Sequence, residues 1–179
     1  MATRRPSLQN LRSLGNFTQV FRWVVEFEKL PAPLSSYKGD GINFRAESTG
    51  LPKCNPNSVE IVIRGGKLKR PGMADYENTI SLTLVETVDN YVSNFIREWR
   101  ELCWETENGS TGITQNFEDI EGTLITTRLN NKDEPIWQYK LFGCFLETGE
   151  PGGEPDASTA EPYKPILTLS FDYFNDKAL

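Results

Sequence analysis

Apolar and polar side chains alternate along several stretches of this chain, and a period of two is the pattern of β-strands with one buried face. In the stretch 20–30, Phe21, Trp23, Val25 and Phe27 alternate with residues that are mostly charged. The same alternation recurs at 42–49, 58–64, 77–87, 123–129, 136–147 and 166–174. The pattern therefore predicts a mainly β protein built from antiparallel strands.

The period changes to three and four after residue 87, which is the spacing of an apolar stripe on a helix. The stripe consists of Val88, Val92, Phe95, Ile96, Trp99, Leu102 and Cys103. Asp89 places a negative charge at the expected first turn, where it favours a helix start. We expect one helix of about 15 residues ending near Cys103, and no other strongly helical segment.

The clearest hairpin lies in the second half of the chain. The stretches 123–129 and 136–147 are joined by Asn130-Asn131-Lys132-Asp133, a turn-forming sequence. The return strand is expected to place Trp137, Tyr139, Leu141 and Phe145 on one face, and Gln138 and Lys140 on the other.

Residues 65–75 combine glycine and proline with the basic residues Lys67, Lys69 and Arg70, and we expect a loop there. Its start, Gly65-Gly66-Lys67, resembles a phosphate-binding loop only in part, because it lacks the required spacing and precedes no helix. A hairpin connection is the preferred interpretation.

The chain shows no internal repeat or linker, so we expect a single domain over residues 1–179. It would have an N-terminal arm over 1–16 and a flexible acidic loop over 148–165. The expected architecture is an antiparallel β-barrel or sandwich with one covering α-helix.

Composition narrows the range of functions. The chain has no His, which removes Ser-His and Cys-His pairs, imidazole bases and His-ligated zinc. A formal net charge of −6 argues against electrostatic wrapping of nucleic acid. No stretch approaches the roughly 20 apolar residues that span a bilayer, and Arg4-Arg5 is not followed by a signal-peptide run. These features favour a protein without catalysis, metal or cofactor that is made or assembled in the cytoplasm.

Three further features each have two interpretations. Cys54, Cys103 and Cys144 lack CxxC spacing, which favours packed, reduced thiols over bridges between subunits. The acidic run 118–121 lacks the alternating oxygen donors of a calcium loop, so a solvated loop is favoured. The four tryptophans are favoured as core residues over an aromatic binding platform, because three of them lie on apolar faces.

Four segments, taken in order, resemble the tail tube proteins of contractile-tailed bacteriophages. They are the strand Phe21–Leu30, the run Phe44-Arg45-Ala46-Glu47-Ser48-Thr49-Gly50-Leu51-Pro52, the strand from Tyr76 to Leu84 that leads into the Trp-bearing helix, and the closing run Leu167-Thr168-Leu169-Ser170-Phe171-Asp172-Tyr173-Phe174. The order of elements matches this family from about Phe17 to Phe174. Type VI secretion tube proteins and the tubes of related contractile injection machines share its fold.

The resemblance implies a structural virion protein that forms hexameric rings, which stack into a hollow tube inside the tail sheath. Its partners would be copies of itself, the sheath, the baseplate and the tail terminator, and DNA would pass through without specific binding. It would reside in the virion tail after assembly in the host cytoplasm, with no membrane insertion. Two strand pairs, 42–64 and 123–147, would contribute four strands to a lumen barrel, and the basic loop 65–75 would contact the adjacent ring.

The polar side of these two strand pairs supplies the residues expected to line the channel. They are Asn43, Arg45, Glu47, Glu60, Arg64, Thr126, Arg128, Gln138 and Lys140. A lumen with few, balanced charges suits a conduit, because it avoids trapping DNA through counterion release. An ordinary solvated sheet face is the alternative interpretation.

Other classes of protein remain as alternatives. A β-barrel that binds a small ligand requires an apolar pocket, whereas the predicted hairpin faces are polar. A hydrolase is least favoured, since the sequence has no Gly-x-Ser-x-Gly and no metal signature. A tube-initiator or tail-terminator homologue with the same fold is not separated from a tube subunit by sequence.

Overall fold

The computed structural model describes residues 12, 15–109, 111–149, 158 and 160–179. The fold is mainly β with antiparallel sheets, as the alternation predicts. The strands are β1 (Trp23–Lys29), β2 (Ala46–Thr49), β3 (Lys53–Ile63), β4 (Gly66–Glu77), β5 (Thr79–Leu84), β6 (Gly122–Leu129), β7 (Pro135–Gly149), β8 (Ile166–Ser170) and β9 (Tyr173–Ala178). The helices are η1 (Ala32–Tyr37), α2 (Asp40–Asn43), α3 (Tyr91–Trp104), η2 (Thr106–Asn108) and α4 (Phe117–Ile120).

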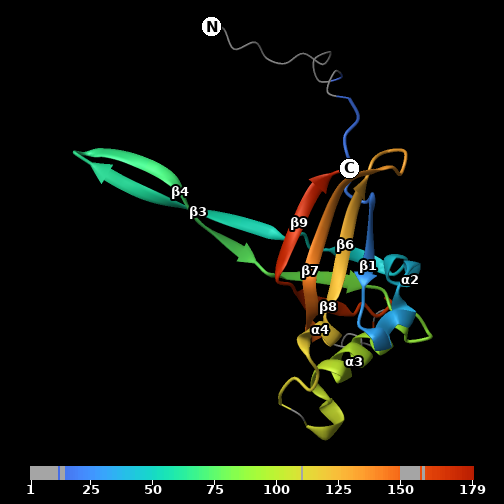
Figure 1. The fold of residues 1–179 in the computed structure, drawn as a ribbon. Helices are drawn as coiled ribbons and strands as arrows, with labels where there is room; N and C mark the ends of the chain where they lie inside the picture. The colour runs from blue at the N-terminus through green and yellow to red at the C-terminus, as the bar shows by residue number, and fades with distance from the viewer. Residues whose placement is uncertain (1–11, 13–14, 110, 150–157, 159) are drawn as a thin grey trace.

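Two sheet layers share the long strand β7 (Figure 1). Its first part pairs with β6 and β9, and β6 pairs with β1, which gives a four-stranded layer. Its last part pairs with β8, which pairs with β5, and β5 pairs with β2. The path of paired strands ends at β1 and at β2, so the described strands form a sandwich and not a closed barrel.

The corner between the layers lies at Gly143 and Asp172. Gly143 has a φ of 64°, and a Cβ added there would collide with the Asp172 carboxylate. The bend reverses which side of β7 faces the core, because Leu141 is buried before it and Leu146 after it. Phe145, which the alternation places with Leu141, is therefore only half-buried and packs on Phe117 outside the core cluster.

The expected closing strand 166–174 is in fact two strands. Leu167 and Leu169 of β8 are buried as predicted, and so is Phe171 just after it. The chain then turns at Asp172, whose N–H bonds to the Phe142 carbonyl, and joins the other layer as β9. The alternation of 166–174 places Tyr173 on the same apolar face as Leu169 and Phe171, but the turn leaves it 60% exposed, so this placement is wrong.

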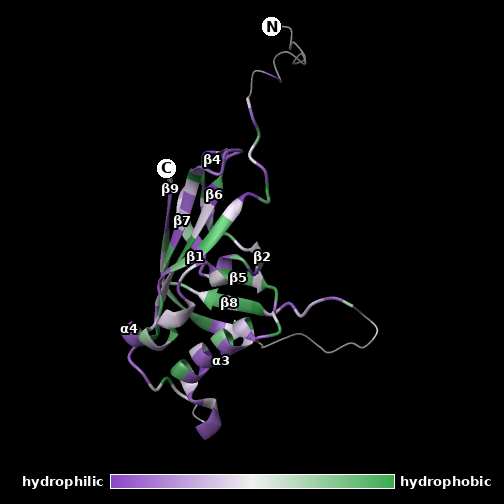
Figure 2. Cartoon of the chain, turned by 90° about the vertical axis from the view of Figure 1, so that its right-hand side faces the viewer, coloured by the Kyte–Doolittle hydropathy of each residue, from purple (hydrophilic) through white to green (hydrophobic). Residues whose placement is uncertain are grey.

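Helix α3 covers one end of the two layers, below them in Figure 1. Its stripe of Val92, Phe95, Ile96, Trp99 and Cys103 is buried as predicted, and Figure 2 shows the apolar face turned inward. The helix begins later than the stripe suggests, because Val88 is fully exposed before it. Trp99, Phe95 and Phe27 of β1 form an aromatic cluster. The Trp99 indole N–H donates to the Ile120 carbonyl at 3.1 Å, which fastens α4 to α3.

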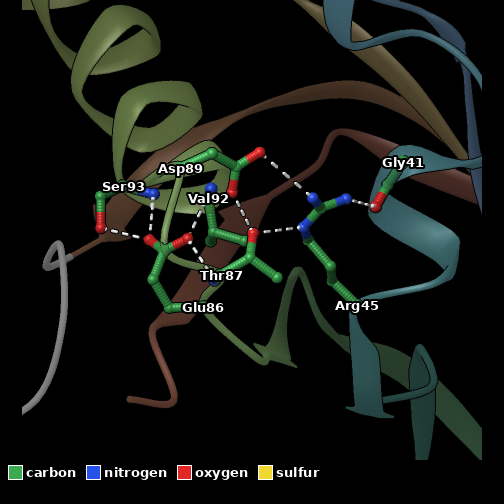
Figure 3. Close-up of polar contacts among 7 residues, drawn as sticks. All are labelled: Gly41, Arg45, Glu86, Thr87, Asp89, Val92 and Ser93. Atoms are coloured by element: carbon green, nitrogen blue, oxygen red, sulfur yellow. Dashed lines mark hydrogen bonds and ion pairs between the residues drawn. The ribbon is translucent and has the colours of Figure 1, made fainter. Parts of the chain in front are cut away.

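A polar network fixes the start of α3 (Figure 3). The Glu86 carboxylate accepts hydrogen bonds from the N–H groups of Val92 and Ser93 and from the Ser93 hydroxyl. These groups include orphan donors of the first helical turn, so Glu86 stands in for a cap. Burial raises the pKa of Glu86, but the hydrogen bonds from Ser93, Thr87 and Val92 outweigh it and hold that pKa below its usual value.

Arg45 extends this network toward β2. Its guanidinium donates to the Gly41 carbonyl and the Thr87 hydroxyl, each at 3.0 Å, and pairs with Asp89 at 3.5 Å. It also lies over the Tyr91 ring, 4.1 Å from the centroid. Arg45 therefore ties the segment before β2 to the start of α3.

Two strand predictions need correction. The expected strand 42–49 is a helical turn, α2, followed by the four-residue strand β2. Gly39, with a φ of 122°, permits the turn that starts α2. The loop expected over 65–75 is instead strand β4, which pairs with β3 along its length. The strand pair expected over 42–64 therefore does not exist as such, whereas the pair expected over 123–147 is the observed hairpin of β6 and β7.

Candidate assembly interfaces

A long hairpin of β3 and β4 projects from the body of the protein (Figure 1). Arg64 and Gly65 form its turn with φ values of 48° and 83°, the left-handed pair of a type I′ turn. The preference for a hairpin connection over a phosphate loop at Gly65-Gly66-Lys67 is thereby confirmed. Every residue of both strands is exposed, and the hairpin pairs with no other strand of the described chain.

The two faces of the hairpin differ in chemistry. Residues that pair across the strands share a face. One face carries Val59, Ile61, Ile63 and Leu68, which are 42–58% exposed, together with Arg70. The other carries Glu60, Val62, Lys67 and Lys69, with an ion pair of 3.0 Å between Glu60 and Lys67. The hairpin is therefore an amphipathic ribbon whose apolar face has no cover within the described chain.

The hairpin is also the basic part of an acidic chain. Residues 53–77 carry five Lys and Arg against three Asp and Glu, which leaves 14 against 22 elsewhere. A second copy of this chain therefore presents the hairpin with a surface of opposite net charge.

The four-stranded layer has an inner face in the core and an outer polar face. Strand register places Phe27, Leu124 and Leu141 inside, and their alternates Glu26, Ile125 and Lys140 outside. Lys140 pairs with Glu28 across the outer face, and Phe142 stacks on Tyr173 with centroids 4.7 Å apart. This outer face mixes both signs of charge with a few apolar groups.

The nine residues predicted to line a channel do not share one surface. Gln138 and Lys140 lie on the outer face of the four-stranded layer, as expected for such a role. Thr126 and Arg128 lie on the opposite, inner face, because they pair with Tyr139 and Trp137. Thr126 is 2% exposed, so the premise that these four residues share a polar side is wrong.

The other five lie elsewhere. Asn43 ends α2 and accepts a hydrogen bond from the Val25 N–H on the edge of β1, and Arg45 belongs to the network of Figure 3. Glu47 is on β2 and pairs with Lys164 at 2.8 Å. Glu60 and Arg64 are on the projecting hairpin, with Lys67, Lys69 and Arg70. The expected inter-ring residues thus lie on a strand and not in a loop.

An open groove of about 720 Å³ lies beside β2, and the sequence pattern does not predict it. It is lined by residues 18–22, by Ala46–Thr49 with Leu51, by Asn43, and by Trp23, Thr126 and Arg128 from the inner face. Val20 is 96% exposed and Phe21 is 71% exposed at its rim. An apolar, open groove of this size is typical of a binding surface.

Unpartnered polar atoms gather beside this groove. Thr126 Oγ1, Arg128 Nε and Trp137 Nε1 are buried, and none has a hydrogen-bond partner among the described residues. Arg128 and Trp137 are register partners, with the guanidinium 5.7 Å from the indole centroid. Each buried polar group without a hydrogen bond destabilises the fold by about 1–3 kcal/mol. A complex with a partner that supplies acceptors to these groups would therefore be stabilised.

The alternation of apolar and polar residues within 123–129 is the only feature of the sequence that could have indicated the groove. Thr126 and Arg128 share the parity of Leu124, which is buried in the core. Ile125 is also buried, on the outer face, so the stretch does not reveal its inner side by pattern alone.

The three cysteines and the four tryptophans are the remaining side chains with distinctive chemistry. Cys103 and Cys144 are buried free thiols as expected, whereas Cys54 is an exposed free thiol on the hairpin. Trp99 is fully buried, and Trp23 and Trp104 pack against the core cluster, which supports their interpretation as core residues. The described residues contain no group of three or more acidic or Cys side chains positioned for a metal, and no helix among them is long and apolar enough to cross a membrane.

The fold is that of tube-related proteins of contractile injection machines. A chain of the anti-feeding prophage cap, described as a tube-terminating cap, has a similar structure, with a TM-score of 0.63 and 14% sequence identity. The match covers 92% of this chain and 93% of that one. A chain from the PVC sheath/tube terminator of an extracellular contractile injection system matches with a TM-score of 0.63, 14% identity, and coverage of 92% and 99%. A chain from the PVC sheath-tube complex matches with a TM-score of 0.60 and 15% identity, and the match covers 97% of this chain and 99% of that one. No protein-family model and no curated protein sequence matches the chain.

Proposed function

We propose that this chain is a structural protein that assembles with copies of itself into the tube of a contractile injection machine. The observation that carries the proposal is the end-to-end likeness in fold, which covers at least 92% of both chains for the tube-terminating cap and both PVC structures. The projecting hairpin supports it, because its exposed apolar face suits a protein that is buried in an assembly. In this role the chain carries no active site and works as one tube domain.

The finer form of the proposal is the tail tube of a contractile phage. Six copies form a ring, rings stack into a tube inside the sheath, and the baseplate and terminator close the two ends. DNA passes through the lumen on its way into the host cell. The resemblance of the sequence to contractile-tail tube proteins supports this form over a tube of another injection machine.

We propose that the outer face of the four-stranded layer lines the channel. Gln138 and Lys140 of the predicted set lie there, and Glu26 and Glu28 lie beside them on β1. Because the charges on this face are mixed and partly paired, duplex DNA gains little from counterion release along it. The basic residues Lys67, Lys69 and Arg70 would contact the adjacent ring from the hairpin.

A second candidate is the tube terminator, which the two terminator matches favour. A terminator and a tube subunit differ in the assemblies that the purified protein forms. A tube subunit forms rings that continue to stack, whereas a terminator forms single rings and stops growth.

Sedimentation velocity over a range of concentrations separates these outcomes. We expect a ring-sized species that gives way to longer polymers as concentration rises. Rings that never stack would favour the terminator, and monomer at every concentration, with no growth on baseplate components, would overturn both forms of the proposal.

A further inference from the structure

We propose that the groove beside β2 is filled by the β3–β4 hairpin of a second copy of this chain. One strand of that hairpin adds to the open edge of β2, and the apolar face of the hairpin covers the groove. The inference rests on the proposed self-assembly and names the surfaces that make the contact.

The groove requires an occupant that is both apolar and rich in hydrogen-bond acceptors. Its rim exposes Val20 and Phe21, and Leu51 is 38% exposed within its lining. Thr126 Oγ1 and Arg128 Nε, both in residues of the lining, lack partners among the described residues. Arg128 also forms no ion pair within the described chain, so it favours carbonyl or carboxylate acceptors.

The edge of β2 can accept a strand. Among the described strands β2 lies at the end of its layer and pairs only with β5, so its other edge has N–H and C=O groups beside the groove that no described strand pairs. The edge of β1 across from it is already blunted, because the Asn43 side chain accepts the hydrogen bond from the Val25 N–H at 3.0 Å. Strand addition at this groove is therefore directed to β2.

The hairpin supplies what the groove lacks. It offers Val59, Ile61, Ile63 and Leu68 on one face, and no strand in the described part of the chain pairs with either of its outer edges. A lone two-stranded ribbon is marginally stable in water, so docking against a third strand stabilises it. Its net positive charge complements the net negative charge of a second copy as a whole, while the groove itself carries Arg22 and Arg128 against Glu47.

The contact is heterologous, since the hairpin and the groove are different surfaces of one chain. Repetition of such a contact builds a closed ring or an open stack and does not stop at a pair. The inference thereby links a local feature of the chain to the polymer that the proposed function requires.

Disulfide trapping between two variants tests the contact. Both carry Cys54→Ser; one also carries Ser48→Cys on β2, and the other carries Ile61→Cys on the apolar face of the hairpin. After mixing and mild oxidation, we expect a cross-linked dimer on a non-reducing gel. Val62→Cys is the matched control, because it lies next to Ile61 on the charged face, and it should give several-fold less dimer.

Assembly of charge variants gives an independent readout. Ile61→Asp should abolish polymers in sedimentation velocity while the circular dichroism spectrum of the monomer stays unchanged, because Ile61 is exposed and outside the core. Val62→Asp should leave assembly intact. Addition of Phe21→Lys at the groove rim should restore part of the assembly lost in Ile61→Asp.

The outcomes separate the two proposals. Polymers that form with equal trapping at residues 61 and 62 would overturn the groove contact but keep the tube proposal. Trapping specific to residue 61 without any polymer would keep the contact and overturn the tube. Failure of both trapping and assembly would overturn both. Occupancy of the groove by a small ligand, with Ile61→Asp fully assembled, would overturn the groove contact and keep the tube proposal.

Discussion

Gly143 shows how one residue decides the geometry of this fold. It takes a left-handed φ at the bend of β7, and the Asp172 carboxylate occupies the space that a side chain would need. The alternation of 136–147 predicts the strand but not the bend, because a period of two carries no information on a reversal of faces. Residues before the bend were therefore assigned to the correct face, and Phe145 after it was not.

We predict that Gly143→Ala destabilises the monomer by about 1–3 kcal/mol, because Ala at this φ is strained and its Cβ collides with Asp172. Urea unfolding followed by tryptophan fluorescence measures the change. Gly112→Ala is the control, since a Cβ there meets no atom within 4 Å. Equal stability of the two variants would show that the bend tolerates a side chain.

Glu86 allows a prediction about pH. Glu86→Gln should lower the free energy of unfolding by about 1–2 kcal/mol at pH 7, since the amide replaces a charged acceptor at the start of α3. The folded-state pKa of Glu86 lies below its unfolded value of about 4.5, so its contribution is full above that value and is lost as pH falls through the folded pKa. The difference between the two proteins should shrink below about pH 4.5. Glu107→Gln on the exposed surface is the control, and a difference independent of pH would contradict the role of the charge.

The three thiols should differ in reactivity. Burial raises the pKa of Cys103 to about 11 and that of Cys144 to about 12, whereas Cys54 is exposed. We expect a thiol reagent at neutral pH to label Cys54 rapidly and the other two only after unfolding. Peptide mapping by mass spectrometry after brief labelling identifies the modified residue, and rapid modification of Cys144 in the native protein would contradict its burial.

At the scale of elements, the sequence predicts the elements whose apolar residues recur with a regular period, and it misses those whose period is interrupted or too short. β1, β5, the β6–β7 hairpin and α3 each show a clear period, and each was predicted near its observed bounds. β4 was predicted as a loop because Gly66, Pro71 and Gly72 interrupt a strand that has no core to face. α2 was missed because four residues are too few for a helical period.

The hairpin should be dispensable for folding. None of its residues belongs to the core cluster, so replacing residues 57–73 with a short Asn-Gly turn should change the melting temperature of the monomer by only a few degrees. The same deletion should abolish assembly, because it removes the ribbon that covers the groove. Calorimetry and sedimentation velocity on one preparation measure both effects. Loss of the fold on deletion would show that the hairpin stabilises the monomer itself.

At the scale of the molecule, the site could be predicted only in part. The resemblance predicts the tube-related fold that the structure has, and Gln138 and Lys140 lie on an outer sheet face. The groove could not be predicted, because it forms between residues 18–22 and β2, which are brought together only by the sheet order. Thr126 and Arg128 were misplaced because β6 buries side chains on both of its faces.

Self-assembly is the central claim, and electron microscopy of the purified protein tests it most directly. We predict class averages of rings with a central channel and sixfold symmetry, at six times the 20.3 kDa mass of the chain, that stack end to end at higher concentration. Uniform 20.3 kDa particles without a channel, at every concentration and with baseplate components present, would contradict the claim.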